Sequence, residues 1–260
     1  MADGDAPNHV NPVRALLRED RATAGLMVTM ASPQLAQTLA ASGMDWLVFD
    51  MEHGMISVET LHAMIAATAG TSCAPLARVP WNVNWLVKPV LDAGAMGIMF
   101  PMVMNSDDVR AAVSSTRYPE NGDRGWGPLY SSMRWGMSRD EYVRRADAEI
   151  VRIFLIEHPE AVKNIEDIVR VDGVDVIVPA TFDLSVNMGY LDGPDHPDVQ
   201  EAVGKIQKAA RNAGVPLGGW AWSTEQGNER IEQGYRMLAF GFDVTLVGGA
   251  VSELLTGLER

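Results

Sequence analysis

Apolar runs alternate with amphipathic segments along most of the chain. Eight short runs are predominantly apolar, and they cover residues 24–30, 45–51, 74–79, 96–103, 150–157, 174–180, 215–221 and 237–243. The segments between them place apolar residues at helical spacing, as at residues 12–19, 33–43, 58–70, 158–171 and 198–214. The pattern predicts a chain in which strands and helices alternate.

Strands without an apolar-polar alternation are typical of a parallel sheet covered by helices on both faces. Eight strand and helix units in about 250 residues match a TIM (β/α)8 barrel, so we expect an α/β fold of this type. A doubly wound sheet usually has a glycine-rich phosphate loop after its first strand, and residues 25–34 contain none. The longest connection, residues 117–149, is expected to be a functional loop because of its length.

Composition narrows the partners. The 260 residues are 47% hydrophobic, which suits a single barrel domain at 11–260 after a flexible lead-in at 1–10. A net charge of -13 and scattered Lys and Arg residues argue against a nucleic-acid partner. The sequence shows no signal segment and no apolar run near the roughly 20 residues that span a bilayer, so we expect a cytoplasmic protein without a membrane partner. Cys73, the only cysteine, excludes an intrachain disulfide.

Ionisable residues gather where the predicted strands end. They are Asp50, Glu52 and His53 after the second strand, Arg78 in the third, Glu157 in the fifth and Asp183 after the sixth. A TIM barrel builds its site at the carboxyl ends of its strands, so topology alone brings these side chains together. No G-x-S-x-G nucleophile elbow is present, and no lysine ends a strand, which disfavours serine hydrolysis and Schiff-base chemistry.

Two carboxylates could share a metal. Glu157 and Asp183 belong to successive strands, and a site of oxygen ligands favours Mg²⁺ or Mn²⁺. Each carboxylate could instead cap the helix that follows it. The sequence leaves both readings open.

Three further residues have alternative roles. His53 could be a general acid or base, because its ordinary pKa of about 6.5 needs little adjustment, or it could be structural. Arg78 could meet an anion or form an ion pair with Asp50 or Glu52. Asp92 ends a predicted helix, and the pattern alone gives it only a structural role.

The sequence resembles the HpcH/HpaI aldolase family of metal-dependent pyruvate aldolases, from residue 11 to about residue 250. The resemblance rests on the order and spacing of "GMDWLVFDMEHG", "LARVP", "VLDAGAMGIMFPMV", "TRYPENGDRGWG", "IEHPEAVKNIEDI", "FDLSVNMGY" and "HPDVQ". It implies a barrel of the phosphoenolpyruvate/pyruvate type whose last helix is exchanged between subunits. It also implies a homo-oligomer, usually a hexamer built as a trimer of dimers.

The resemblance also implies roles for individual residues. Glu157 and Asp183 match the metal-binding carboxylates, and His53 matches the catalytic histidine. Asp92 matches the aspartate that supports this histidine, often from the partner subunit. Arg78 matches the arginine that contacts the oxygen of the ketoacid and stabilises the enolate.

The chain departs from the family pattern at the ketoacid cradle. Leu155 stands where family members usually carry Gln, two residues before the metal-binding Glu157. Ala180, Thr181 and Phe182 stand where Gly-Pro-Ala or a similar segment usually offers backbone N–H groups to the pyruvate carboxylate. The resemblance therefore implies that these four residues, with Arg78, form an altered cradle for the 2-oxo acid, which is pyruvate or a related acid.

The resulting hypothesis is an aldolase that uses Mg²⁺, Mn²⁺ or Co²⁺ to cleave a 4-hydroxy-2-oxo acid, reversibly, to pyruvate or a related 2-oxo acid and an aldehyde. Asp50 and Glu52 would orient His53 and the waters of the metal. The closest alternative is a metal-dependent 2-oxo acid decarboxylase or another enolate-forming lyase. A rival of another class is a metabolite-binding barrel without catalysis.

Overall fold

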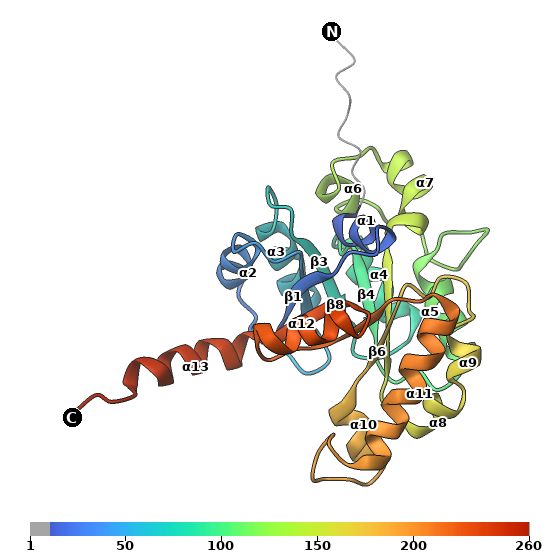
Figure 1. The fold of residues 1–260 in the computed structure, drawn as a ribbon. Helices are drawn as coiled ribbons and strands as arrows, with labels where there is room; N and C mark the ends of the chain where they lie inside the picture. Colours follow the sequence, from blue (N-terminus) through green and yellow to red (C-terminus); the bar gives the residue numbers. More distant parts are fainter. Residues whose placement is uncertain (1–10, 260) are drawn as a thin grey trace.

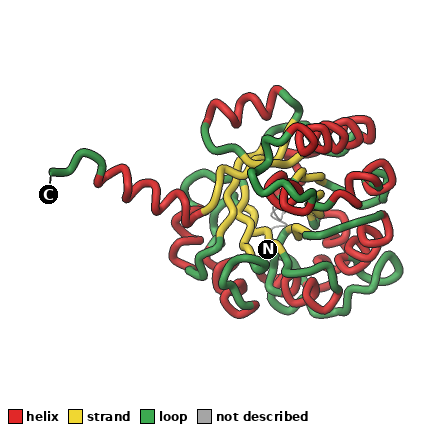
Figure 2. The backbone as a smooth tube through the Cα atoms, turned by 90° about the horizontal axis from the view of Figure 1, so that it is seen from below, coloured by secondary structure: helices red, strands yellow, loops and turns green. Residues whose placement is uncertain are grey.

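The computed structural model describes residues 11–259, which include a closed barrel of eight parallel strands in sequence order, surrounded by helices (Figures 1 and 2). The strands are β1 (Thr23–Val28), β2 (Trp46–Asp50), β3 (Ala74–Arg78), β4 (Gly97–Phe100), β5 (Val151–Ile156), β6 (Val176–Pro179), β7 (Leu217–Trp220) and β8 (Tyr235–Phe242). Each strand lies within or close to one of the eight predicted runs, which confirms the TIM barrel. The predicted lead-in at 1–10 lies outside the described residues.

Helices follow every strand, and α1 precedes the first. They are α1 (Pro12–Arg18), α2 (Pro33–Ala40), α3 (Val58–Ala67), α4 (Asn84–Asp92), α5 (Ser106–Thr116), α6 (Ser131–Arg134), α7 (Arg139–Glu149), α8 (Pro159–Lys163), α9 (Ile165–Ile168), α10 (Thr181–Asn187), α11 (Pro197–Ala213), α12 (Thr224–Glu232) and α13 (Asp243–Leu255). Val13 of α1 packs with the residues that fill the barrel. This contact places α1 over the amino-terminal end of the barrel.

Side chains alternate between the barrel interior and the outer helices, as the pleat of a strand requires. In β5, Val151, Ile153 and Leu155 join the interior cluster, whereas Phe154 and Ile156 join the outer one. A continuation of the same alternation turns Glu157 inward. The same alternation turns Asp50, the last residue of β2, and Arg78, the last residue of β3, inward. Three strands therefore bring an ionisable side chain to the barrel mouth.

Gly25 permits close packing at one point inside the barrel. A Cβ atom at Gly25 would lie 2.1 Å from the ring of Trp46, a distance at which one of the two must move. The indole of Trp46 is fully buried, and its Nε1 donates to Thr23 Oγ1 at 3.1 Å. Gly25 therefore makes room in β1 for the large side chain that fills the barrel next to it.

The long connection at 117–149 contains more regular structure than its sequence predicts. Helix α7 fills its second half, and Ser138 begins this helix by accepting a hydrogen bond from the N–H of Glu141. Trp135 is buried, and its indole donates to the carbonyl of Gly94 at 3.2 Å. The expectation of one long loop was therefore wrong for this half.

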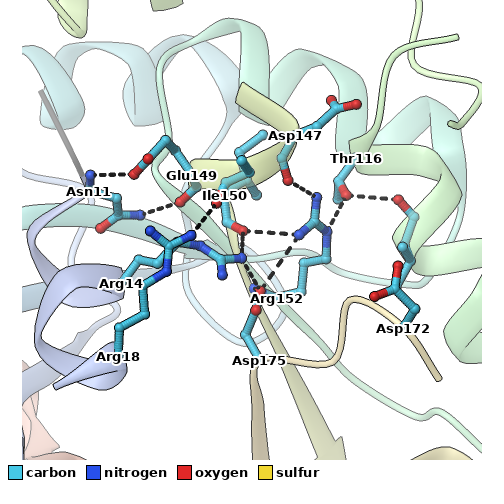
Figure 3. Close-up of polar contacts among 12 residues, drawn as sticks. Asn11, Arg14, Arg18, Thr116, Asp147, Glu149, Ile150, Arg152, Asp172 and Asp175 are labelled. Carbon is cyan, nitrogen blue, oxygen red and sulfur yellow. Dashed lines mark hydrogen bonds and ion pairs between the residues drawn. The ribbon is translucent and has the colours of Figure 1, made fainter. Parts of the chain in front are cut away.

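A buried arginine ties the outer face of β5 to its neighbours (Figure 3). Arg152 donates from Nε to Thr116 Oγ1 at 2.6 Å and from Nη2 to the carbonyl of Asp147 at 2.9 Å. Asp175 lies 3.6 Å from Nη1 of Arg152 and 2.7 Å from Nη2 of Arg14. Burial lowers the pKa of Arg152 to about 10, so it stays charged at neutral pH. This network joins α1, β5 and the start of β6.

Helix α13 projects from the barrel as an arm (Figures 1 and 2). Its first residue is fixed, because the Asp243 carboxylate accepts from the N–H groups of Thr29 and Met30 and from the Thr29 hydroxyl. Beyond it the helix exposes large apolar side chains, namely Val244, Leu246, Val247, Val251, Leu254 and Leu255. Among the described residues, no helix is long and apolar enough to cross a membrane.

Candidate active site

Asp50 and Arg78 form a buried ion pair at the carboxyl ends of β2 and β3. The strand register places them side by side. The guanidinium donates from Nε to Oδ1 at 2.9 Å and from Nη2 to Oδ2 at 2.6 Å. Burial would raise the pKa of Asp50, but the hydrogen bonds and charge of Arg78 hold it below its ordinary value. The pair therefore remains ionised inside the barrel mouth.

Asp50 also shapes the turn that follows β2. Its Oδ1 accepts hydrogen bonds from the backbone N–H groups of Glu52 at 3.0 Å and His53 at 3.2 Å. A Cβ atom at Gly54 would lie 2.2 Å from the carbonyl oxygen of Asp50, so the turn requires glycine there. The local sequence thus fixes the backbone that presents His53.

Two further carboxylates crowd the same region. Glu52 Oε2 lies 3.2 Å from Arg78 Nε, and the buried Glu157 accepts a hydrogen bond from the N–H of Met102. Burial raises the pKa of both glutamates to about 7, and repulsion from Asp183 adds to the effect in each. Asp183 therefore lies close enough to Glu52 and Glu157 to disfavour the charged form of both glutamates.

Such crowding fits a divalent cation, because a cation would relieve the repulsion among oxygen donors. Asp183 lies in the first turn of α10 and is exposed. Among the described residues, no group of three or more His, Cys, Asp or Glu could by itself hold a metal ion. Glu157 and Asp183 remain a possible pair of ligands, because Mg²⁺ is often held by one or two carboxylates with substrate and water.

The capping alternative does not describe Glu157. Helix α8 is capped by His158, whose Nδ1 accepts from the N–H of Glu160 at 3.1 Å. Helix α10 begins at Ala180 without a side-chain cap. Asp183 is the third residue of α10, still within the first turn, where a negative charge interacts favourably with the helix dipole.

His53 is an accessible ionisable group of the site. Its side chain is 65% exposed, and its Nε2 lies 4.0 Å from Glu52 Oε2. It lines a cavity of about 370 Å³. An imidazole in this position can exchange a proton with a bound molecule while a carboxylate stands behind it.

The cavity brings together most of the residues that the sequence singled out. Its lining consists of Thr29, Asp50, His53, Arg78, Ala180, Thr181, Phe182, Asp183, Trp220, Trp222 and Phe242. Sequence reasoning missed Thr29 and the three aromatic residues after β6. Their signal was available, because each lies at or just beyond the carboxyl end of β1, β7 or β8.

Four predicted residues are not part of this lining. Glu52 and Glu157 lie near Arg78, which does line the cavity, whereas Asp92 and Leu155 lie elsewhere. Asp92 ends α4, and its Oδ1 accepts from Nη2 of the buried Arg124 at 2.9 Å; no hydrogen bond or ion pair joins it to His53 among the described residues. Leu155 lies one inward position below Glu157, fully buried in the barrel interior. A supporting role for Asp92 would therefore require its approach from another subunit.

The chain matches the family model described as HpcH/HpaI aldolase/citrate lyase over residues 23–250. It is 36% identical to the 4-hydroxy-2-oxo-heptane-1,7-dioate aldolase of Shigella sonnei (strain Ss046), over 94% of this chain and 93% of the relative. It is 35% identical to the hydroxypyruvate/pyruvate aldolase of Paraburkholderia phytofirmans (strain DSM 17436 / LMG 22146 / PsJN), over 90% of this chain and 92% of the relative.

A solved structure shares the whole architecture. The crystal structure of an HpcH/HpaI aldolase/citrate lyase family protein from Burkholderia cenocepacia J2315 superposes with a TM-score of 0.88 at 33% sequence identity. The superposition covers 94% of this chain and 98% of that one. The barrel and its additional helices are therefore shared with that protein as one unit.

Proposed function

Because this chain belongs to the HpcH/HpaI aldolase/citrate lyase family, whose curated relatives are named as aldolases and hence carbon-carbon lyases, we propose that it is a divalent-metal-dependent aldolase. Its reaction is the reversible cleavage of a 4-hydroxy-2-oxo acid to pyruvate, or a related 2-oxo acid, and an aldehyde. The observation that supports this most directly is the crowded group of Glu52, Glu157 and Asp183 beside Arg78.

Glu157 and Asp183 would hold the cation, which fits their oxygen donors and their mutual repulsion. When bound there, a divalent cation supplies Lewis-acid stabilisation of the negative charge that develops on substrate oxygen. Mg²⁺, Mn²⁺ and Co²⁺ are the candidates.

Cleavage breaks the bond between C3 and C4 of the substrate. The electron pair remains on the 2-oxo acid fragment as an enolate, and the 4-hydroxyl loses its proton as the aldehyde forms. Arg78 places positive charge beside the enolate oxygen. Its Nη1 has no hydrogen-bond partner among the described residues, since Nε and Nη2 are taken by Asp50.

His53 accepts the proton of the 4-hydroxyl in the cleavage direction. The C3 carbon of the enolate then takes up a proton, from the imidazolium or from water, to give the 2-oxo acid, and synthesis reverses both transfers. The Glu52 carboxylate, 4.0 Å from His53 Nε2, stabilises the imidazolium that forms. Asp50 holds the backbone of His53 through its N–H. The charged turn after β2 therefore delivers an acid/base group to the barrel mouth.

The first turn of α10 would receive the carboxylate of the 2-oxo acid. The N–H of Ala180 already bonds to the carbonyl of Ile156 at 3.1 Å. The N–H groups of Thr181 and Phe182 lie before the first intrahelical bond, which Leu184 makes to Ala180. Binding at Thr181 and Phe182 rather than at Ala180 follows from this arrangement.

The proposal extends to the assembly. The exposed apolar residues of α13 would be covered by a second copy of this chain, in a homo-oligomer of exchanged helices. The same association would bring Asp92 of one subunit close to His53 of the other, since the two residues do not interact within one chain. A hexamer of paired protomers is the proposed state.

The test measures pyruvate release from 4-hydroxy-2-oxo acids, coupled to lactate dehydrogenase. Protein stripped with EDTA should be inactive and should recover with Mg²⁺, Mn²⁺ or Co²⁺. Glu157→Gln and Asp183→Asn should lower the restored rate by at least about 100-fold, because even residues behind metal ligands cost 10- to 100-fold.

Glu160→Gln is the matched control, because Glu160 is an exposed carboxylate in the adjacent helix that pairs with Lys163. It should keep the full rate. Undiminished turnover in both ligand variants would refute a metal site at these residues.

One observation favours a second candidate. Phe182 is 58% exposed and lines the cavity beside Asp183. Its ring therefore narrows the space next to a bound 2-oxo acid in which the aldehyde fragment would lie. A lyase that decarboxylates an oxaloacetate-like acid would need no aldehyde there. Carbon dioxide release from oxaloacetate without activity on any 4-hydroxy-2-oxo acid would favour this reading.

A further inference from the structure

One wall of the active-site cavity is aromatic. Phe182 lies in the first turn of α10, Trp220 ends β7, Trp222 lies two residues after Trp220, and Phe242 ends β8. All four line the cavity opposite the ionisable groups of β2 and β3. A molecule held at the acid/base residues would therefore meet ring faces with its distal end.

The position of Trp222 is set by its neighbours. Its ring stacks on that of Phe242, with centroids 6.3 Å apart at 27°, and its backbone N–H donates to Gln226 Oε1 at 3.0 Å. Gly241 has a φ of 84°, and a Cβ atom there would lie 3.2 Å from the indole. The sequence thus leaves space at Gly241 that Trp222 uses, which preorganises the wall.

Positive charge is scarce on this side. Arg78 is the single Lys or Arg among the described residues that line the cavity, and it is already paired with Asp50 and Glu52. The Shigella sonnei relative is named for a heptane-1,7-dioate substrate. The distal carboxylate of such a molecule needs a cation or hydrogen-bond donors to replace its water.

A neighbouring cavity of about 480 Å³ shares Phe182, Trp220 and Trp222 with this one and contains Arg230. That guanidinium lies over the ring of Tyr235, 5.2 Å from its centroid, and Nη1 donates to Gln233 Oε1. Carboxylates of Asp195 and Glu229 line the same cavity. Among the described residues that line this second cavity, Arg230 is therefore the single cation that could pair with a distal carboxylate, and the carboxylates of Asp195 and Glu229 compete for it.

From these features we propose that the fragment released as the aldehyde carries an uncharged apolar group, such as an aryl ring, and that Trp222 with Phe182 selects it. The inference rests on the proposed aldolase function and deepens it. An apolar group bound against these rings is stabilised by burial of its apolar surface and by ring stacking. The rings offer a distal carboxylate neither a positive charge nor a hydrogen-bond donor. The aromatic wall would thus separate this chain from dicarboxylate aldolases.

The experiment compares two substrates on the metal-restored protein. One is 4-hydroxy-2-oxo-4-phenylbutanoate and the other is 4-hydroxy-2-oxo-heptane-1,7-dioate, and kcat/KM is measured for each by pyruvate release. We expect a preference of about tenfold or more for the phenyl substrate, and Trp222→Ala should lower this ratio about tenfold. Trp222→Phe should preserve the ratio, and the matched control Trp85→Ala, an exposed Trp of α4, should not change it.

Exchange of the methyl protons of pyruvate in D₂O, followed by NMR without aldehyde, separates the two levels of the argument. Exchange together with equal or higher kcat/KM for the dioate overturns the inference but leaves the aldolase intact. Loss of dioate turnover in Arg230→Gln also overturns it. Absence of both exchange and pyruvate release refutes the proposed function itself. If Trp222→Ala does not fold, Phe182→Ala provides the same comparison.

Discussion

At the scale of single residues, the barrel mouth is organised by Arg78, which is paired with Asp50 and Glu52, the two ion-pair partners that the sequence offered. Asp50, Arg78 and Glu157 were found because each interrupts an apolar run, and a charge there is costly without a partner. The choice of Asp50 as the bidentate partner of Arg78 depends on strand register, which no local pattern states. Three residues of the aromatic wall, Trp220, Trp222 and Phe242, were missed as site residues, because an aromatic residue in or next to an apolar run looks like core.

The raised pKa values of Glu52 and Glu157 predict a pH-dependent response to metal. In the metal-free protein both carboxyls titrate near pH 7, above the unfolded value of about 4.5. Between these values the folded state binds more protons, so the unfolding free energy should fall as pH rises from about 4.5 to 7. For Glu157 the loss is of the order of 3 kcal/mol.

Added Mg²⁺ should therefore raise Tm little at pH 5.5 and most at pH 8, where the ligands are ionised. Glu157→Gln should remove the metal-induced shift and raise the metal-free Tm at pH 8, because a neutral side chain keeps an acceptor for Met102. Differential scanning calorimetry with EDTA or Mg²⁺ measures both. A metal-induced shift of equal size at all pH values would contradict this account.

At the scale of secondary structure, the eight strands were predictable because a barrel strand is buried on both sides and so reads as a continuous apolar run. Helix α7 was not, although Ser138 and Glu141 are spaced as a helix start. Its low apolar content and the Gly-rich segment before it favoured a loop, whereas packing of Tyr142 and Ala146 against the core stabilises the helix in addition to the Ser138 cap.

Two glycines test the packing of these elements, because one is tightly surrounded by other atoms and the other is not. Gly25→Ala should lower the unfolding free energy by about 2 kcal/mol or more, because the new methyl group overlaps the ring of Trp46. Gly204→Ala should raise it by up to about 1 kcal/mol, since Gly204 lies in the middle of α11 with nothing near its missing Cβ. Urea denaturation of both variants measures the difference, and equal effects would contradict the packing described for β1.

At the scale of the whole molecule, one chain closes the barrel but leaves a large apolar surface uncovered on α13. Helix α13 is anchored at Asp243 and then leaves the body with its apolar side chains uncovered. Exposed apolar surface of this extent is typical of an interface. The family resemblance implied an exchanged last helix, but the residue pattern alone did not, because contacts with another copy cannot be read from the order of residues in one chain.

The proposed assembly predicts a change of mass on substitution in α13. Val247→Glu with Val251→Glu should convert the oligomer to smaller species, because two buried charges without partners oppose association. Ser252→Glu, which adds charge on the same helix without removing an apolar side chain, should change the mass less. Size-exclusion chromatography with light scattering reports the result, and a native protein that is already monomeric would end the proposal.

The inward alternation that carries Glu157 to the barrel mouth restricts how the chain can change in length. Insertion or deletion of one residue between Val151 and Glu157 would reverse every later side chain, turning Glu157 toward the outer helices and Ile156 toward the cavity. A change of length in the connections between strands does not reverse the side chains of a strand in this way. Over evolutionary time, length variation in this enzyme should therefore accumulate in the loops, while the spacing within β2, β3 and β5 remains fixed.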